Sequence, residues 1–534
     1  MPHDNLLAEA IAARRFFWSL EFIPSVDRVL RDELVKLGGI AEVMREHPLL
    51  ATFAVTDRVV SERDPEPIAA ATNLLDTTGK QPVVHFSGKG RELSDLQRTV
   101  ERMAENGLSN LLLLTGDRLK AEPAVGRARY LESVPAVQAV RRWQPDWLLA
   151  VAFNPFKYCE EDAMAQYLKL SKKMAAGANL VITQIGLDPL KYVETQRWLD
   201  SRYRGVPVVA NVLPLSVSRA RYMRAHKLAG ITITDSMMAL LEAEAQHLPD
   251  KGAARVLRRL ALQIVGVRLA GYAGVQVTGL HTPEKLTELE GAVARATADC
   301  PDRSTWQLAW SDSITAPDGT RADPTPAGSS WYLPDVSLEG RSMATRISKL
   351  SGARASAGRR LHYRLMRGVH ATLFGDGRLA RAFGGLLGAT VPAGSLRARL
   401  LERFEYAVKH PLVGCETCGM CRLAATQYVC PETCPKGLSN GPCGGTTQNR
   451  CEFGDRECIH SVKYRIAKTE GVVDELEELL IPAVPLERRH TSSWPAHYQG
   501  RGPHIEIVPI ERIGVARKRR AGSLPAATSQ PLSH

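Results

Sequence analysis

Residues 91–117 read RELSDLQRTVERMAENGLSNLLLLTGD, and the fold follows from this stretch. In its first part the apolar residues recur at intervals of three and four, which is typical of an amphipathic helix. Its second part is the continuous apolar run NLLLL, followed by a turn that ends at Asp117. A strand without polar alternation is covered on both faces, so the stretch predicts a helix that leads into a buried parallel strand.

The same alternation runs from residue 16 to about residue 300. Helical segments such as EEDAMAQYLKLSKKMAAGA separate the apolar runs FFWSLEFIP, LLATFAV, QPVVHFSG, NLLLLTGD, LLAVAFNP, LVITQIG, PVVANVLPL and GVQVTGL. Strands separated by helices indicate a parallel sheet with helices on its faces. Eight such units predict an α/β fold, a (β/α)8 TIM-type barrel, over residues 1–300.

Six consecutive strands of this barrel end on a polar side chain. In chain order these are Glu21, Thr56, His85, Asp117, Asn154 and Gln184. Because such barrels carry their chemistry at the C-terminal ends of the strands, the six predict a site at one rim. Each also has a structural interpretation, such as an ion pair for Glu21 or a helix cap for Asp117. The apolar neighbours of Glu21 favour a raised pKa, which suits a general acid.

Composition and charge limit the other classes of function. The chain has 534 residues and a net charge of +12, part of it in residues 352–370 and part in the tail 515–534. No base-stacking aromatics interleave with the arginines, so we expect solvated helical faces and no nucleic-acid partner. No apolar run approaches the ~20 residues of a membrane span and no secretory signal precedes the barrel. We therefore expect a cytoplasmic protein without a membrane partner.

Eight of the ten cysteines lie close together near the C-terminus, as Cys415, Cys418, Cys421, Cys430, Cys434, Cys443, Cys451 and Cys458. In a cytoplasmic protein such a cluster binds metal more often than it forms disulfides. Zinc is one candidate, because closely spaced cysteine pairs build tetrahedral sites. The C-x2-C-x2-C opening and the two Cys-Pro pairs favour an iron–sulfur cluster of the 4Fe-4S type. The eight thiolates suffice for two tetrahedral sites, or for one cluster with additional structural ligands.

These patterns divide the chain into four parts. Residues 1–300 form the barrel and residues 301–400 a linker with a helical segment, because turn-forming residues dominate its start. Residues 401–483 form the cysteine-rich metal-binding domain, and residues 484–534 a disordered tail.

The barrel resembles the methylenetetrahydrofolate reductase family over residues 16–290. The motifs that carry the resemblance are EF-x-P at Glu21, VT at Thr56, SERDP at 61–65, LTGD at Asp117, KKMAAGANLVITQ, and LPLS at 213–216. The family consists of FAD-dependent barrels that interconvert 5,10-methylenetetrahydrofolate and 5-methyltetrahydrofolate. The resemblance therefore implies a tetrahydrofolate substrate and FAD as cofactor.

The resemblance also assigns roles. It implies that Glu21 is the general acid that protonates the folate N10, and that Asp117 stabilises the iminium cation. Gln184 falls on a residue that hydrogen-bonds the pterin. The positions that the resemblance places at FAD are Thr56, His85, Gly116, Asp117, Tyr130, Asn154 and Lys173. Six positions depart from the residues usual in the family, on the flavin face where a nicotinamide stacks, so the resemblance leaves the electron donor open. They are Ile23, Ser25, Asp57, Asn154, Ala210 and Asn211.

The string YxCPxxCPKxxxNGPCGG resembles the C-terminal domain associated with methylenetetrahydrofolate reductases, over residues 400–470. That resemblance implies electron transfer or docking to a protein partner. Two alternatives remain: a flavoprotein that acts on another reduced pterin, and a non-catalytic scaffold that uses the cysteine-rich domain. We expect a homo-oligomer.

Overall fold

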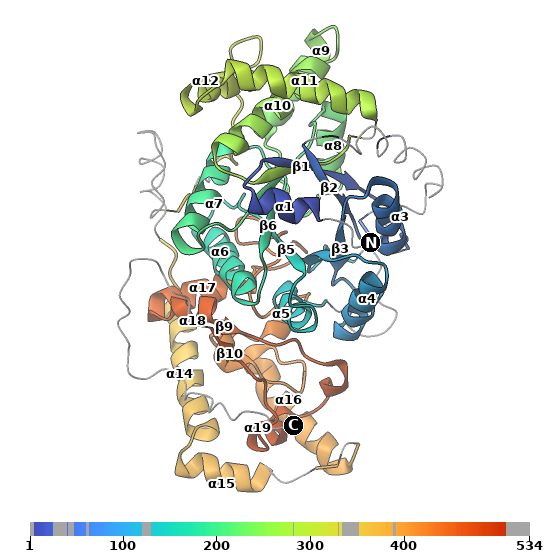
Figure 1. Ribbon diagram of the computed structural model, residues 1–534. Helices are drawn as coiled ribbons and strands as arrows, with labels where there is room; N and C mark the ends of the chain where they lie inside the picture. The colour runs from blue at the N-terminus through green and yellow to red at the C-terminus, as the bar shows by residue number, and fades with distance from the viewer. Residues whose placement is uncertain are drawn as a thin grey trace.

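The computed structural model shows a barrel with a smaller C-terminal region packed below it (Figure 1). The described residues are 5–24, 40, 47, 49–59, 63–119, 130–280, 282–328, 331–333, 352–387, 391–392 and 394–508. The motif at 61–65 lies partly outside these residues, and the basic tail from 509 lies wholly outside them.

The eight apolar runs of the sequence form eight parallel strands that close into one barrel. They are β1 (Phe17–Phe22), β2 (Leu50–Val55), β3 (Val83–Ser87), β4 (Asn110–Leu114), β5 (Leu148–Phe153), β6 (Leu180–Thr183), β7 (Val208–Val212) and β8 (Gly274–Val277). The barrel closes because β1 pairs with β2 on one side and with β8 on the other. The predicted TIM-type fold is confirmed.

Helices surround the strands and close one end of the barrel. They are α1 (Leu6–Ala12), α3 (Pro67–Thr78), α4 (Leu93–Glu105), α5 (Ser133–Trp143), α6 (Glu160–Ala175), α7 (Pro189–Arg202), α8 (Val217–Ala225), α9 (Asp235–His247), α10 (Ala253–Leu269) and α11 (Pro283–Asp299). On α1, Leu7 and Ala10 belong to an apolar cluster with Phe17, Val83 and Leu112 from the strand interiors. This cluster fills the N-terminal end of the barrel interior, so we look for a ligand site at the opposite rim.

The region expected to be a linker is partly helical and partly an extension of the barrel. Residues 303–313 form α12 (Arg303–Ser313), whose Trp306 and Trp310 are buried in a cluster with α10. The other helices described in this region are α14 (Ala357–Phe374), α15 (Arg378–Leu387) and α16 (Leu396–Val413), the last of which extends past residue 400.

We call residues 415–508 the cysteine module. Its elements are short: η1 (Leu423–Thr426), η2 (Pro431–Thr433), α17 (Ile459–Glu470), α18 (Val473–Glu478), β9 (Leu479–Leu480), η3 (Leu486–Arg488), α19 (Ser493–Tyr498) and β10 (Glu506–Ile507). Residues 484–508, expected in a disordered tail, instead form η3, α19 with a buried Trp494, and a strand that pairs with β9. No helix within the described ranges is both long and apolar enough to cross a membrane.

The module packs on α6 of the barrel, where α17 and α18 both contact it (Figure 1). The outward face of a barrel helix normally meets solvent, but on α6 the charged side chains Glu160, Asp162 and Lys172 are buried. Two of these buried carboxylates accept hydrogen bonds from the module: Tyr464 donates to Glu160 at 2.9 Å, and the Asn449 backbone amide donates to Asp162 at 2.8 Å. The interface is therefore extensive and polar, and it lies beside the open rim of the barrel.

Candidate active site at the junction of the barrel and the cysteine module

A cavity of about 270 Å³ lies at the C-terminal ends of the strands. Of the barrel residues predicted from the sequence, it is lined by Glu21, Thr56, His85, Gly116, Asp117, Asn154, Lys173 and Gln184. The module contributes Pro442, Cys443, Gly444, Gly445 and Glu452. The structure thus brings all the predicted strand-end residues to one cavity, and it adds a wall that the barrel alone does not have.

Glu21 lies near the C-terminal end of β1 and faces this cavity. Its Oε1 accepts a hydrogen bond from Gln276 Nε2 at 3.2 Å. Burial raises the pKa of the Glu21 carboxyl, and hydrogen bonds from Thr278 and Gln276 oppose the rise only in part. A carboxyl with a raised pKa holds its proton nearer to neutral pH, as a proton donor requires.

Several buried polar atoms on the cavity wall lack a hydrogen-bond partner among the described residues. They are Thr56 Oγ1, His85 Nε2, Ser133 Oγ, Thr183 Oγ1 and Gln276 Oε1. Burial also lowers the pKa of His85 to about 3, so its ring is neutral at physiological pH. Buried polar groups are nearly always hydrogen-bonded in folded proteins. These atoms are therefore available to hydrogen-bond a polar ligand in the cavity.

These atoms fit the ring end of a flavin, whereas the enclosed volume does not fit a whole dinucleotide. Pockets for drug-sized ligands span roughly 300–1,000 Å³, and this cavity lies just below that range. Two positions expected at FAD already contact protein groups. Asn154 Nδ2 donates to Gly230 O at 2.9 Å and to Gly444 O at 2.8 Å, and Gly116 O accepts from Lys436 Nζ at 2.8 Å.

Three further predicted residues also contact protein groups. Lys173 Nζ donates to Ala152 O at 2.5 Å, and burial with the nearby Lys169 lowers its pKa to about 7. The hydroxyl of Tyr130, which does not line the cavity, accepts from Leu119 N at 2.9 Å. Gln184 Nε2 donates to Ala229 O at 3.1 Å.

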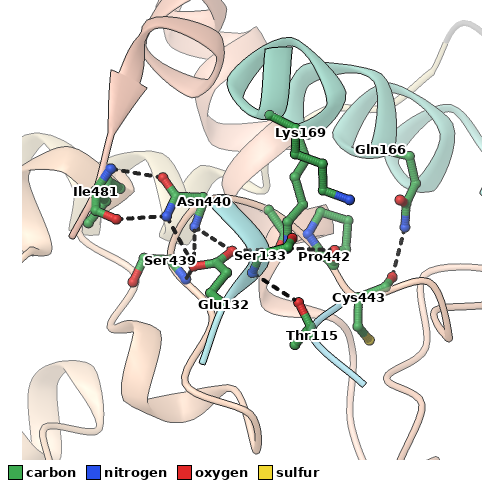
Figure 2. Close-up of polar contacts among 12 residues, drawn as sticks. Thr115, Glu132, Ser133, Gln166, Lys169, Ser439, Asn440, Pro442, Cys443 and Ile481 are labelled. Atoms are coloured by element: carbon green, nitrogen blue, oxygen red, sulfur yellow. Dashed lines mark hydrogen bonds and ion pairs between the residues drawn. The ribbon is translucent and has the colours of Figure 1, made fainter. Parts of the chain in front are cut away.

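The segment 439–446, which we call the glycine loop, forms the module's side of the cavity. Barrel side chains donate to its carbonyl oxygens: Lys169 Nζ to Gly441 O at 3.0 Å and to Pro442 O at 3.1 Å, and Gln166 Nε2 to Cys443 O at 2.7 Å (Figure 2). Lys157 Nζ likewise donates to the carbonyls of Gly444 and Thr446.

Glu132 anchors the start of the glycine loop. Its carboxylate accepts from Ser439 N at 3.0 Å and from Asn440 N and Nδ2 at 3.1 Å (Figure 2). Burial alone would raise the pKa of Glu132, but Lys169 and the amides of Ser439 and Asn440 bring it below its ordinary value. Sequence analysis missed these contacts. The available signals were the string NGPCGG and the dense charges of α6.

The glycines of this loop are required by close approach. Gly441 has φ +152°, and a Cβ there would lie 2.6 Å from Lys169 Cβ. On the barrel side, Gly116 has φ +86°, and a Cβ there would lie 2.2 Å from Ser87 Oγ. A larger residue at Gly441 would separate the glycine loop from α6, whereas one at Gly116 would clash with Ser87 and Lys89 within the barrel.

The eight clustered cysteines are free thiols in two neighbourhoods. Cys430 lies within electrostatic reach of Cys415, Cys418 and Cys421, whereas Cys434 lies within reach of Cys443, Cys451 and Cys458. Burial raises the pKa of Cys415 to about 11 and that of Cys443 to about 12, and a metal ligand must be deprotonated. In the part of the chain that the structure describes, no three or more His, Cys, Asp or Glu side chains are arranged to hold a metal ion. The metal assignment therefore stays a prediction.

Both the barrel and the C-terminal region match models of known protein families. A family model described as "Methylenetetrahydrofolate reductase" matches residues 6–281, more than half of the chain. A second model, "Methylene-tetrahydrofolate reductase C terminal", matches residues 397–484. Methylenetetrahydrofolate reductase 2 of Schizosaccharomyces pombe is 24% identical over 185 residues, which cover 32% of this chain and 29% of the relative. The match thus spans less than a third of that curated relative.

Among solved structures, this chain is similar in part to an uncharacterized protein from Clostridium thermocellum. That protein binds two copies of 5-methyl-5,6,7,8-tetrahydrofolic acid. The TM-score is 0.41 at 15% sequence identity, over 55% of this chain and 98% of the other.

Proposed function

Because the chain belongs to the methylenetetrahydrofolate reductase family, we propose that its barrel interconverts 5,10-methylenetetrahydrofolate and 5-methyltetrahydrofolate. The observation that carries this proposal is the carboxyl of Glu21, whose pKa is raised by burial at the wall of the cavity. The alternatives, another reduced pterin as substrate or a scaffold without activity, are outcomes of the test below.

In the reductive direction Glu21 donates its proton to N10 of the folate, and the bond between N10 and the bridging carbon breaks. The bridging carbon remains on N5 as an iminium cation and accepts a hydride, which makes it a methyl group. The carboxylate of Asp117, on the same cavity wall, favours the cation electrostatically. Gln184 orients the pterin through its amide.

We propose FAD as the redox cofactor; the unpartnered atoms of Thr56, His85 and Ser133 would hold its ring. When bound, the flavin supplies two-electron hydride chemistry. The dinucleotide end would lie outside the enclosed volume, because the glycine loop stands at the rim. A protein electron donor is consistent with that closure, because a nicotinamide dinucleotide would have to enter the cavity through the same opening as the FAD.

The test is an anaerobic titration of the purified full-length chain with 5-methyltetrahydrofolate, followed at the flavin absorbance band. We expect the band to bleach, and we expect Glu21→Gln to lower methylene-folate turnover by 10²-fold or more, within the range of about 10²–10⁴ for acid–base catalysis. Glu9→Gln, on the exposed face of α1, is the matched control and should behave as wild type. A bound flavin that stays oxidised would refute the folate assignment. A folded protein that binds neither flavin nor folate would support the scaffold.

A further inference from the structure

The backbone on both sides of Asp117 is held by the cysteine module. Gly116 O accepts from Lys436 Nζ at 2.8 Å, and Arg118 N donates to Glu452 Oε1 at 2.8 Å. Asp117 therefore lies between two peptide groups whose partners come from another part of the chain, more than 300 residues away.

Lys436 and Glu452 form one unit. Lys436 Nζ lies 2.6 Å from Glu452 Oε2, and both side chains are almost fully buried. The two charges neutralise each other, and each group also makes a hydrogen bond to the barrel: Lys436 donates to Gly116 O, and Glu452 accepts from Arg118 N. A buried pair of this kind is costly to assemble but fixes geometry closely, because either partner alone would be an uncompensated charge.

Contacts around the same turn restrict it further. The Arg118 guanidinium lies 4.9 Å from the ring centre of Phe453, and Lys436 Nζ lies 5.3 Å from that of Tyr130. The Tyr130 hydroxyl in turn accepts from Leu119 N. Tyr130, expected at the cofactor, thus belongs to the same assembly.

From these contacts we infer that Lys436 and Glu452 are positioning residues: they fix the turn 116–118 and so hold the Asp117 carboxylate at the cavity. The active site is then shared by two parts of the chain, with the catalytic carboxylates on the barrel and the support of one of them on the module. This role rests on the proposed function, in which Asp117 stabilises the cation. It gives the fusion of barrel and module a physical reason that does not involve a metal.

The test is a double-mutant cycle on oxidation of 5-methyltetrahydrofolate by an artificial electron acceptor, in the full-length chain. The variants are Asp117→Asn, Lys436→Met and their combination. A displacement of about 1 Å can cost about 100-fold in rate, so we expect Lys436→Met to lower kcat by 10- to 100-fold with KM changed less than threefold. If Lys436 acts through Asp117, the same change in the Asp117→Asn background should lower kcat less than threefold.

Lys468→Met is the matched control, because it removes a different ion pair between module and barrel, that of Lys468 with Glu160. We expect it to change kcat less than threefold in both backgrounds. Lys436→Arg keeps a donor for Gly116 O and should recover most of the rate. If Lys436→Met does not fold, Glu452→Gln replaces it in the cycle, because this variant removes the ion pair with Lys436 and keeps an acceptor for Arg118 N.

Two results would overturn the inference: equal losses of kcat from Lys436→Met in the two backgrounds, or equal losses of kcat from Lys436→Met and Lys468→Met at matched thermal stability. A wild-type protein without turnover would refute the proposed function instead, so the two failures are distinguishable.

Discussion

Lys169 and Glu132 form a buried ion pair, with Nζ 2.9 Å from Oε1, and both residues also bind the backbone of the glycine loop. Lys169 comes from α6, and Glu132 immediately precedes α5. The pair joins two barrel segments to one module segment, so the closure of the cavity depends on it.

We expect Glu132→Gln to detach the glycine loop from the barrel. The change leaves the Lys169 ammonium without its carboxylate, and removing one partner of a buried pair costs about 3–5 kcal/mol. Two backbone carbonyls still accept from Lys169, so the loss should lie near the lower value. The midpoint of thermal unfolding and the rate of limited proteolysis of the module both measure it.

The pH dependence of stability offers a control on this prediction. The folded-state pKa of Glu132 is lowered, so its stabilising contribution is complete above the ordinary value of 4.5 and is lost as pH falls through the folded value. The stability difference between wild type and Glu132→Gln should therefore shrink as pH falls below 4.5. A difference that is independent of pH in that range would contradict the ion-pair account.

Reduction of methylene-folate should depend on a single proton held by Glu21. Because burial raises the pKa of this carboxyl, the protonated form persists to higher pH than in an ordinary glutamate. We expect kcat/KM for reduction to fall as pH rises through that raised pKa, and this limb of the profile to be absent in Glu21→Gln. Stopped-flow rates between pH 5 and 9 measure this pH dependence. If Glu21→Gln keeps the same fall of kcat/KM with rising pH, then a group other than Glu21 causes that fall.

The unpartnered ring nitrogen of His85 should contribute to cofactor binding. With a pKa of about 3 the ring is neutral, so flavin affinity should show no step from His85 between pH 5 and 8. An unmade buried hydrogen bond costs about 1–3 kcal/mol, so His85→Leu should weaken flavin binding by about 10-fold or more. Equilibrium dialysis measures the affinity, with His247→Leu, at the exposed end of α9, as control. Equal affinities in the two variants would remove His85 from the flavin site.

The barrel and its rim were predictable because they depend on local pattern and on one geometric rule. Continuous apolar runs indicated the strands, and the rule that strand ends meet at one rim gathered Glu21, His85 and Gln184 before any coordinates. The family resemblance, carried by motifs such as LTGD, is confirmed by the family match. The assignments of individual residues to acid, cofactor and substrate stay predictions.

The junction was not predictable, because it depends on which surface the module covers. In the sequence, the dense charges of α6 are those of a solvent-facing helix. Neither they nor the string NGPCGG identify Gly441 as the partner of Lys169, 272 residues away. Asn154, which the resemblance places at the flavin, donates its amide to Gly444 O, and this contact likewise joins segments far apart in the sequence. Long-range contacts between polar residues leave no periodicity in either segment.

Gly441→Ala tests the closure through the backbone instead of through charge. A Cβ at this position would lie 2.6 Å from Lys169 Cβ, and the backbone at φ +152° is one that residues other than glycine rarely adopt. We expect the glycine loop to withdraw from α6, which exposes the cavity and loosens the turn at Asp117. Hydrogen exchange of residues 439–446 should then rise at least 10-fold, and the folate rate should fall as in Lys436→Met.

Gly385→Ala is the control, because a Cβ at this exposed position in α15 meets no atom within 4 Å. It should leave exchange and rate unchanged and should stabilise the helix slightly. If Gly441→Ala raises exchange in the glycine loop while the folate rate stays at the wild-type value, then the loop covers the cavity without supporting its chemistry. In that case the hold on Asp117 must come from Lys436 and Glu452 alone, independently of the glycine loop beside them.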